Sequence, residues 1–389
     1  MVSKRERDGA HAESAAGKVT SQGRRRMLKT VASVGVGVGV AGCSGGGDAS
    51  ATTSGGIQAG EVEQLKELSA EEWRKTVSRQ AEKELKEENL QFYAVSKNPK
   101  FIEGIRDHDY EGVYEPLTNS INVVKQSGDT LTQRYQREVQ ADKRNIDVTD
   151  LSNIDALIKA GVPFGDLTHI PAYQDLPEDV KIHPQFGIKN QVVYGLSYNT
   201  EMVSAPPQSW DELMADRFDD GTIVLDWTPK TIMMPVMLDI KGESWLQDLA
   251  DQNPTLIKST YGVPKQVAQG NYGVGYLANY KHPLKFKREG LPTEPVWSRE
   301  ASTPTVAPMG MAAKPQHPWA SYLFLDKYFQ WTDMQVLVEG AVAADRSAAK
   351  PSKLLELVEG KTIPAFFQFE NSIESYETTY QNAIGAPTN

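Results

Sequence analysis

Three polar stretches in the first half of the chain each follow an apolar run and could bind a small ligand. Hydroxyl groups and the free N–H groups at the start of a helix suit anionic or polar ligands. Each stretch taken alone is also typical of an ordinary solvated turn. None carries the lysine-containing pattern of a phosphate loop, so a nucleotide site is not indicated. The candidate binding residues are Ser96, Lys97, Ser127, Gly128, Thr130 and Thr149.

Polar and aromatic residues also stand at the ends of apolar runs in the second half of the chain. We expect them to face the first group across a cleft. Taken singly, the aromatic residues are also typical of core positions, and that alternative stays open here. These candidate binding residues are Tyr198, Trp227, Tyr276, Asn279 and Tyr280.

The chain shows no motif of a hydrolase. The stretch Gly195-Leu-Ser-Tyr-Asn199 lacks the last glycine of a nucleophile elbow, and His-Glu-x-x-His is absent. The six histidines have no metal-ligand spacing, and the single cysteine, Cys43, cannot form an intramolecular disulfide. We therefore predict a binding protein rather than an enzyme, without cofactor or resident metal.

The pattern strand, polar loop, helix recurs three times before residue 165. Strands are expected at Leu90–Ala94, Ile121–Val124 and Ile146–Val148, followed by helices from about Pro99, over Leu131–Ala141, and from Ser152 to Gly161. A capping box at Ser69 and Glu72 starts an earlier helix. Repeated units of this kind predict an α/β fold with a parallel sheet whose loops meet at one edge.

The stretch Gln191–Asn199 is read as a hinge strand between two lobes. Its Val, Tyr and Leu residues favour a buried strand, and Gly195 permits a bend or a close backbone approach. An ordinary core strand of a single domain is the alternative. Thr303–Ala313 is expected to return to the first lobe as a second crossing strand.

The charge of the chain is unevenly distributed. The formal net charge is −10, and residues 1–42 contain eight Lys/Arg and three Asp/Glu, so residues 43–389 carry −10 − 5 = −15. A body this acidic is a poor nucleic-acid binder, because phosphate contacts need a basic face. Nucleic acid is therefore not an expected partner.

The first 42 residues are typical of an export signal. Basic residues are followed by a short apolar run, Thr30–Ala41, which is too short to span a bilayer. Arg24-Arg25 with Met27-Leu28-Lys29 resembles a twin-arginine signal, and Val40-Ala41-Gly42-Cys43 resembles a lipobox. We expect cleavage before Cys43, lipidation of Cys43, and a flexible tether over residues 43–60 that holds the body at the outer face of the cytoplasmic membrane.

The body resembles extracellular solute-binding proteins of ABC importers. The clearest match is Tyr198-Asn-Thr200, Pro206-Pro207 and Trp210-Asp-Glu-Leu213. Weaker matches are Glu72-Trp73, Val263–Tyr276, and Lys314–Asp326 with its Pro-Gln-His-Pro turn. The resemblance implies a class II periplasmic-binding-protein-like fold with the ligand cleft between two lobes. It implies lobe 1 at 61–198 and 301–345, lobe 2 at 199–300, and a C-terminal segment, 346–389, packing on lobe 2.

Within this family the order of elements is most similar to the binders of ferric iron and small anions. Their iron carriers use two adjacent tyrosines at the position of Tyr280 and Lys281. A lysine in place of the second tyrosine would repel a bare cation, so we expect an anionic or polar solute, or a metal held with a co-bound anion.

The resemblance implies a monomer that delivers this solute to an ABC permease. A lipid-anchored surface sensor or adhesion protein is the alternative, and an anchored hydrolase is the weaker one.

Overall fold

The computed structural model describes residues 57, 59–95, 99–151, 153–178, 180–218, 221–229, 232–331, 341–343, 353–361, 364 and 369–387. These residues belong to one compact unit, Ser50–Asn389. The expected export signal, Cys43, most of the tether, Ser96 and Lys97 lie outside the described residues. Among the described residues, no helix combines the length and apolar character needed to cross a membrane.

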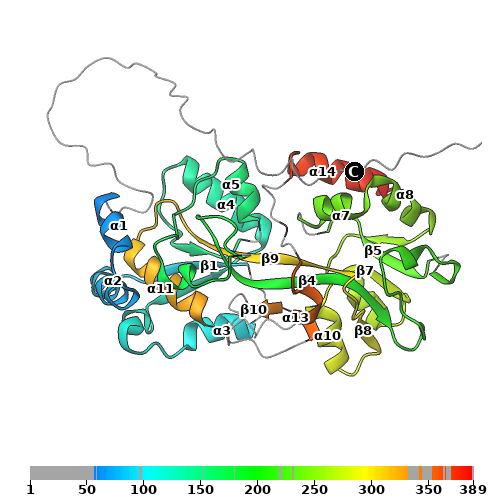
Figure 1. Ribbon diagram of the computed structural model, residues 1–389, viewed down its shortest axis with the longest axis horizontal. Helices are drawn as coiled ribbons and strands as arrows, with labels where there is room; N and C mark the ends of the chain where they lie inside the picture. Colours follow the sequence, from blue (N-terminus) through cyan, green and yellow to red (C-terminus); the bar gives the residue numbers. More distant parts are fainter. Residues whose placement is uncertain are drawn as a thin grey trace, which may run out of the picture. The chain divides into compact units, whose positions relative to one another are not determined.

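One mixed sheet organises the unit (Figure 1). Its strands run in the order β2-β1-β3-β9-β4-β7-β5-β6, and β8 and β10 also pair with β4. Their bounds are β1 Leu90–Ala94, β2 Ile121–Lys125, β3 Val148–Thr149, β4 Gly187–Asn199, β5 Ile223–Asp226, β6 Thr255–Ile257, β7 Val274–Asn279, β8 Thr293–Pro295, β9 Ser302–Met311 and β10 Ala341–Ala343.

Helices connect and cover these strands. Before β4 they are α1 Ala59–Lys66, α2 Ala70–Glu84, α3 Pro99–Asp107, the 3₁₀ helix η1 Gly112–Leu117, α4 Gly128–Gln140, α5 Ile154–Lys159 and α6 Pro171–Gln174. After β4 they are η2 Asp211–Met214, η3 Asp216–Phe218, α7 Met233–Lys241, α8 Glu243–Asp251, α9 Gly262–Ala268, α10 Lys281–Arg288, α11 Pro318–Gln330, α13 Lys353–Val358 and α14 Ile373–Ala383.

Two sets of parallel strands point toward each other along the β4–β9 pair. The strands β1, β2 and β3 are mutually parallel, as are β5, β6 and β7. β3 is antiparallel to β9, β9 to β4, and β4 to β7, so the two sets run in opposite directions. Thr149, the last residue of β3, pairs with Gly310, whereas Asn279, the last residue of β7, pairs with Tyr194.

The distance between the two sets of strand ends follows from this register. On β9, Gly310 pairs with Thr149 of β3, and Thr303 is level with the β7 end because both Thr303 and Asn279 pair with Tyr194, so seven residue steps separate the two levels. At about 3.3 Å per residue, the strand ends are roughly 23 Å apart along β9. The carboxyl ends of both parallel sets therefore face the middle of the β4–β9 pair.

The buried side chains form two main hydrophobic clusters, one for each set of strands. The first includes Phe92, Leu131 and Phe324 and takes in the end of β9 through Met311. The second includes Trp210, Leu225 and Tyr276 and takes in the end of β4 through Leu196. The crossing-strand prediction is confirmed by the strand pairing, while the predicted lobe boundaries stay a prediction.

Most predicted elements are present, with shifts at their ends. The capping box of Ser69 and Glu72 opens α2, and the strand predicted at Leu90–Ala94 has those bounds. α4 starts at Gly128 rather than Leu131, because the Ser127 side chain accepts a hydrogen bond from the Thr130 amide and caps it. α14 packs against α7 and α8, with Tyr380 buried in the second cluster.

The stretch Trp210-Asp-Glu-Leu213 forms only a short helix. The Ser209 hydroxyl accepts from the Glu212 amide at 3.3 Å, which caps its first turn. The helix nevertheless ends after one 3₁₀ turn, η2, because Ala215 adopts an extended conformation.

At Gly195, β4 is irregular and both backbone and a side chain approach closely, as the sequence allowed. The register of β4 against β7 shifts between Gly195 and Ser197. A Cβ atom at position 195 would lie 2.6 Å from the Ala301 carbonyl oxygen and would collide with the Tyr280 hydroxyl. Backbone and a buried ring therefore occupy the space that any other side chain needs.

We predict that Gly195→Ala lowers the free energy of unfolding by about 1–3 kcal/mol, the usual cost of overpacking. Urea unfolding of the purified protein measures the loss. Gly112→Ala is a poor control because its φ is +60°, whereas Gly60→Ala is suitable because a Cβ there meets no atom within 4 Å. Equal stability of the Gly195 and Gly60 variants would contradict this packing.

A second prediction concerns Glu84 at the end of α2, whose carboxylate accepts from the Ala320 amide at 2.9 Å. Burial, with a smaller effect of the buried Asp147 carboxylate, raises the pKa of Glu84 to about 7, against the effect of the nearby His317. The folded state therefore keeps a proton between about pH 4.5 and 7 that the unfolded state releases, so stability falls as pH rises through this range.

We expect Glu84→Gln to remove this fall, because an amide oxygen can still accept from Ala320 but carries no charge. From pH 5 to pH 8 the wild type should lose about 1–3 kcal/mol relative to the variant. Urea unfolding at both pH values gives the difference. The matched control is Glu82→Gln on the exposed side of α2, which should follow the wild type.

Candidate functional site

The carboxyl ends of the first strand set present hydroxyl groups around the start of α4. The Ser127 hydroxyl donates to the Thr130 hydroxyl at 2.8 Å, and both side chains are exposed. Gly128, the first residue of α4, is half-buried. The structure thus brings three of the predicted residues together at a helix start, where unpaired N–H groups favour an anion.

The Thr149 side chain forms a hydrogen bond within the sheet and is not accessible to a ligand. It is fully buried, and its hydroxyl donates to the Tyr93 carbonyl at 3.1 Å, which ties β3 to β1. Next to it, the Asp150 carboxylate accepts from the Val95 amide. The expectation that the Thr149 side chain is open to a ligand is corrected, because its hydroxyl serves strand pairing.

The carboxyl ends of the second strand set are held together by a buried carboxylate. Asp226, at the end of β5, accepts from the Thr228 amide at 2.9 Å and from the Thr260 hydroxyl at 2.6 Å. Lys258, exposed at the end of β6, lies with its ammonium 5.0 Å from the centre of the Trp227 ring. A cation on an aromatic face is stabilised there and stays available to an anion.

Asn279 ends β7 and orients the next helix. Its side-chain oxygen accepts from the Lys281 amide at 3.2 Å, and the residue is buried. Burial raises the pKa of the neighbouring Tyr194 to about 12, against the hydrogen bond from Asn279. Of the residues predicted in the second half, Trp227 and Asn279 therefore lie at adjacent strand ends.

Of the three predicted tyrosines, Tyr276 and Tyr280 are fully buried and Tyr198 is partly exposed. Tyr276 is fully buried among Trp210 and Trp245, with ring centres 5.6 and 6.1 Å away. Tyr280 is fully buried, and its hydroxyl donates to the Val296 carbonyl at 2.6 Å. Burial raises the pKa of both phenols. Tyr198 pairs with Val274 at the opposite end of β7 from Asn279.

This outcome corrects the expectation that Tyr276 and Tyr280 face a cleft. Alternation along a strand places every second side chain on the same face, but the sequence does not say which face is covered. Here both faces of β7 are covered, and all six of its residues are buried. The core reading of these aromatic residues therefore holds in this structure.

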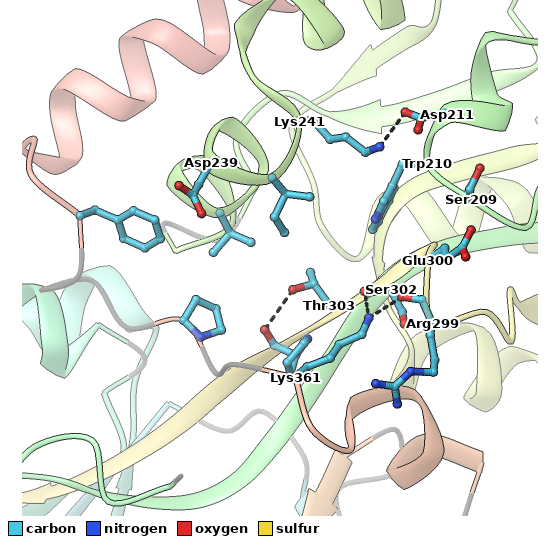
Figure 2. Close-up of a pocket in the computed structure, with 15 residues that line it drawn as sticks. Ser209, Trp210, Asp211, Asp239, Lys241, Arg299, Glu300, Ser302, Thr303 and Lys361 are labelled. Atoms are coloured by element: carbon cyan, nitrogen blue, oxygen red, sulfur yellow. Dashed lines mark hydrogen bonds and ion pairs between the residues drawn. The ribbon is translucent and has the colours of Figure 1, made fainter. Parts of the chain in front are cut away.

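A cavity of about 630 Å³ lies elsewhere, and the sequence did not point to it (Figure 2). It is bounded by α7, by the beginning of β9, and by the segment near Lys361 and Phe369. None of the predicted binding residues lines it. Its walls consist of Ser209, Trp210, Asp211, Val236, Asp239, Ile240, Lys241, Arg299, Glu300, Ser302, Thr303, Pro304, Lys361, Pro364 and Phe369.

The part of the chain that the structure describes contains no group of three or more His, Cys, Asp or Glu that could hold a metal ion. The sequence does not reveal the cavity, because the residues that form it, such as Asp239, Arg299 and Lys361, are far apart in the chain.

Comparison with known proteins agrees with this architecture. Residues 118–280 match the family of bacterial extracellular solute-binding proteins. This is a family of binding proteins, not of enzymes, as the absence of a catalytic motif predicted. A comparison with functionally curated proteins gives no match.

Several solved structures share the fold at low sequence identity. The substrate-binding protein of an ABC transporter from Agrobacterium tumefaciens has a TM-score of 0.61 and 12% identity, covering 76% of this chain and 94% of that one. Iron-bound HitA from Pseudomonas aeruginosa has a TM-score of 0.57 and 16% identity, covering 76% and 99%. AfuA from Actinobacillus pleuropneumoniae, with fructose-6-phosphate bound, has a TM-score of 0.56 and 14% identity, covering 77% and 97%.

At these low identities, the structural similarity establishes the fold alone. The family match covers the segment that includes α4, β4, β5 and β7. The predicted α/β fold is confirmed. The chain has the mixed α/β fold of periplasmic binding proteins, and its residues 118–280 match the family of bacterial extracellular solute-binding proteins.

Proposed function

We propose that this protein binds a small anionic solute between the facing strand ends and delivers it to an ABC importer. The observation that carries the proposal is the orientation of the two parallel strand sets, whose carboxyl ends face each other along β4 and β9. Ligands of α/β folds bind outside the carboxyl ends of parallel strands. A solute held from both sides would favour a closed form by its higher affinity for that form.

The groups at the strand ends favour an anion over a bare ferric ion. Ser127, Thr130 and the start of α4 offer hydrogen-bond donors on one side. Lys258 on the other side offers an exposed ammonium group. The Tyr280 phenol, which the resemblance to iron carriers would assign to iron, already donates to Val296. HitA and AfuA, which share the fold, are iron-bound and fructose-6-phosphate-bound in their structures. A phosphorylated or carboxylated solute, or a metal held through such an anion, suits these groups.

A thermal-shift screen of phosphate, sugar phosphates, citrate and ferric citrate tests this proposal, with neutral sugars and polyamines for comparison. A true ligand at 100 times its Kd should add about 2.7 kcal/mol to the free energy of unfolding. We expect Lys258→Gln to weaken binding about tenfold, because one charge-assisted contact is lost. Solution scattering should show contraction on binding.

Lys265→Gln is the matched control, since Lys265 is exposed on α9 and no described contact holds it at the strand ends. Equal binding by the Lys258 and Lys265 variants would exclude the second strand set from the site. Absence of any anion-dependent shift would reject the solute class, and a shift without contraction would reject closure. A surface sensor would also bind the anion, depend on Lys258 and contract on binding, but it would not stimulate transport by a permease.

We further propose that the protein is exported and anchored through Cys43. The basic stretch before Thr30–Ala41 and the Ala41-Gly42-Cys43 end support this proposal. Mass spectrometry of the protein from native membranes should find a diacylated N-terminal Cys43, and Cys43→Ala should release the protein from the membrane fraction. A mature N-terminus at another residue would contradict it.

A further inference from the structure

The cavity between α7 and the start of β9 holds charges of both signs that lack a counter-ion. Lys241 and Asp211 pair with each other at 2.6 Å. Arg299, Lys361, Asp239 and Glu300 also line the cavity, and none of them has an oppositely charged side chain beside it among the described residues. Lys361 is half-buried and the other three residues are exposed, so the charge that most needs a partner is that of Lys361.

The two cations lie together and contact only neutral groups. The Lys361 ammonium donates to the Ser302 carbonyl at 2.5 Å and to the Arg299 carbonyl. The Arg299 guanidinium donates to the Glu359 carbonyl at 2.7 Å and to the Glu356 carbonyl, at the end of α13. Burial, with a smaller effect of Arg299, lowers the pKa of Lys361 to about 8, as expected for a cation without a carboxylate partner.

A buried hydroxyl group lies on the same wall of the cavity as Arg299 and Lys361. Ser302 is 4% exposed and lines the cavity, and its hydroxyl has no hydrogen-bond partner in the part of the chain that the structure describes. Buried polar groups in proteins are nearly always hydrogen-bonded, so an unpaired hydroxyl on a cavity wall points to a missing acceptor or donor. Arg299, Lys361 and Ser302 together suit a carboxylate group.

Asp239 and the apolar surface of α7 lie away from Arg299 and Lys361, whereas Glu300 lies near Ser302 and Arg299 (Figure 2). Figure 2 shows Asp239 on the α7 side of the cavity and Arg299 and Lys361 on the opposite side, with Trp210 on a wall between them. Val236 and Ile240 of α7 add apolar surface, and Ile240 is 49% exposed. A single anion would leave Asp239 unpaired, and a single cation would leave the basic corner unpaired.

We infer that this cavity binds a small zwitterion with an apolar body, of the amino-acid or betaine class. Its carboxylate contacts Arg299, Lys361 and Ser302, and its ammonium group lies toward Asp239. The volume of about 630 Å³ is in the usual range for small-molecule sites. This site is separate from the strand ends, because none of the residues proposed for the solute lines it.

Calorimetric titration of the full-length protein at pH 7 tests this inference. The probes are glycine betaine and L-valine, each with analogues that carry one charge: 3,3-dimethylbutyrate and tetramethylammonium for betaine, and isovalerate and isobutylamine for valine. The tighter of the two zwitterions should bind at least tenfold more tightly than either of its analogues, because only the zwitterion satisfies both walls. Equal binding by a single-charge analogue, or no binding of either zwitterion at millimolar concentration, would overturn the inference.

Substitutions at the two walls test which residues contact the zwitterion. Asp239→Asn should weaken the zwitterion by about tenfold or more, and Lys361→Met should do the same at the other wall. Because Lys361 is half-buried and its replacement could disturb folding, the exposed Asp239 decides the test. Asp248→Asn on α8, exposed and outside the cavity, is the matched control and should bind as the wild type does. Equal binding by the Asp239 and Asp248 variants would overturn the proposed site, and Lys258→Gln should leave zwitterion binding unchanged.

Discussion

The antiparallel pairing of β4 with β9 is the constraint on which the rest of the structure depends. This pair extends over Gly187–Gly195 of β4 and connects the two parallel strand sets. Because β3 joins β9 at one end and β7 joins β4 at the other, the two sets must run in opposite directions. A parallel pairing of β4 and β9 would have turned one set of strand ends away from the other.

The same pair carries polar groups in its interior. Gln191 is fully buried in β4, and neither atom of its amide has a hydrogen-bond partner within the described residues. Thr305 in β9 is likewise buried with an unpaired hydroxyl in the described part. Unpaired buried polar groups reduce stability. Their position between the two sets of strand ends indicates that stability is not what this segment is optimised for.

By contrast, the elements around the first hydrophobic cluster are joined by a buried carboxylate that accepts several hydrogen bonds. The fully buried Asp326 carboxylate accepts from Arg74 at 2.8 Å, from the Tyr114 hydroxyl at 2.6 Å and from the Ala172 amide at 2.8 Å. These donors come from α2, η1 and α6, and Asp326 lies on α11. A buried charge with several donors keeps its helices in one arrangement, because removing any partner leaves the charge exposed to apolar surroundings.

The sequence by itself determined the local elements and the fold class. Periodicity and caps, such as Ser69 with Glu72 and Ser127 before α4, depend on neighbours within four residues and can be read directly. The three strand–loop–helix units and the crossing strands followed from the same signals. The residues Ser127, Gly128 and Thr130 could be placed together because they are close in the chain.

Only the tertiary structure decided which side chains are open to a ligand. Thr149 ends β3, Tyr280 directly follows β7 and Tyr276 lies within β7, and packing buries all three side chains. The cavity joins Asp239, Arg299 and Lys361, which are up to 122 positions apart (361 − 239), and no local pattern marks such a set. Burial and the meeting of distant charges depend on which faces pack together, and that is a property of the whole chain rather than of any stretch of it.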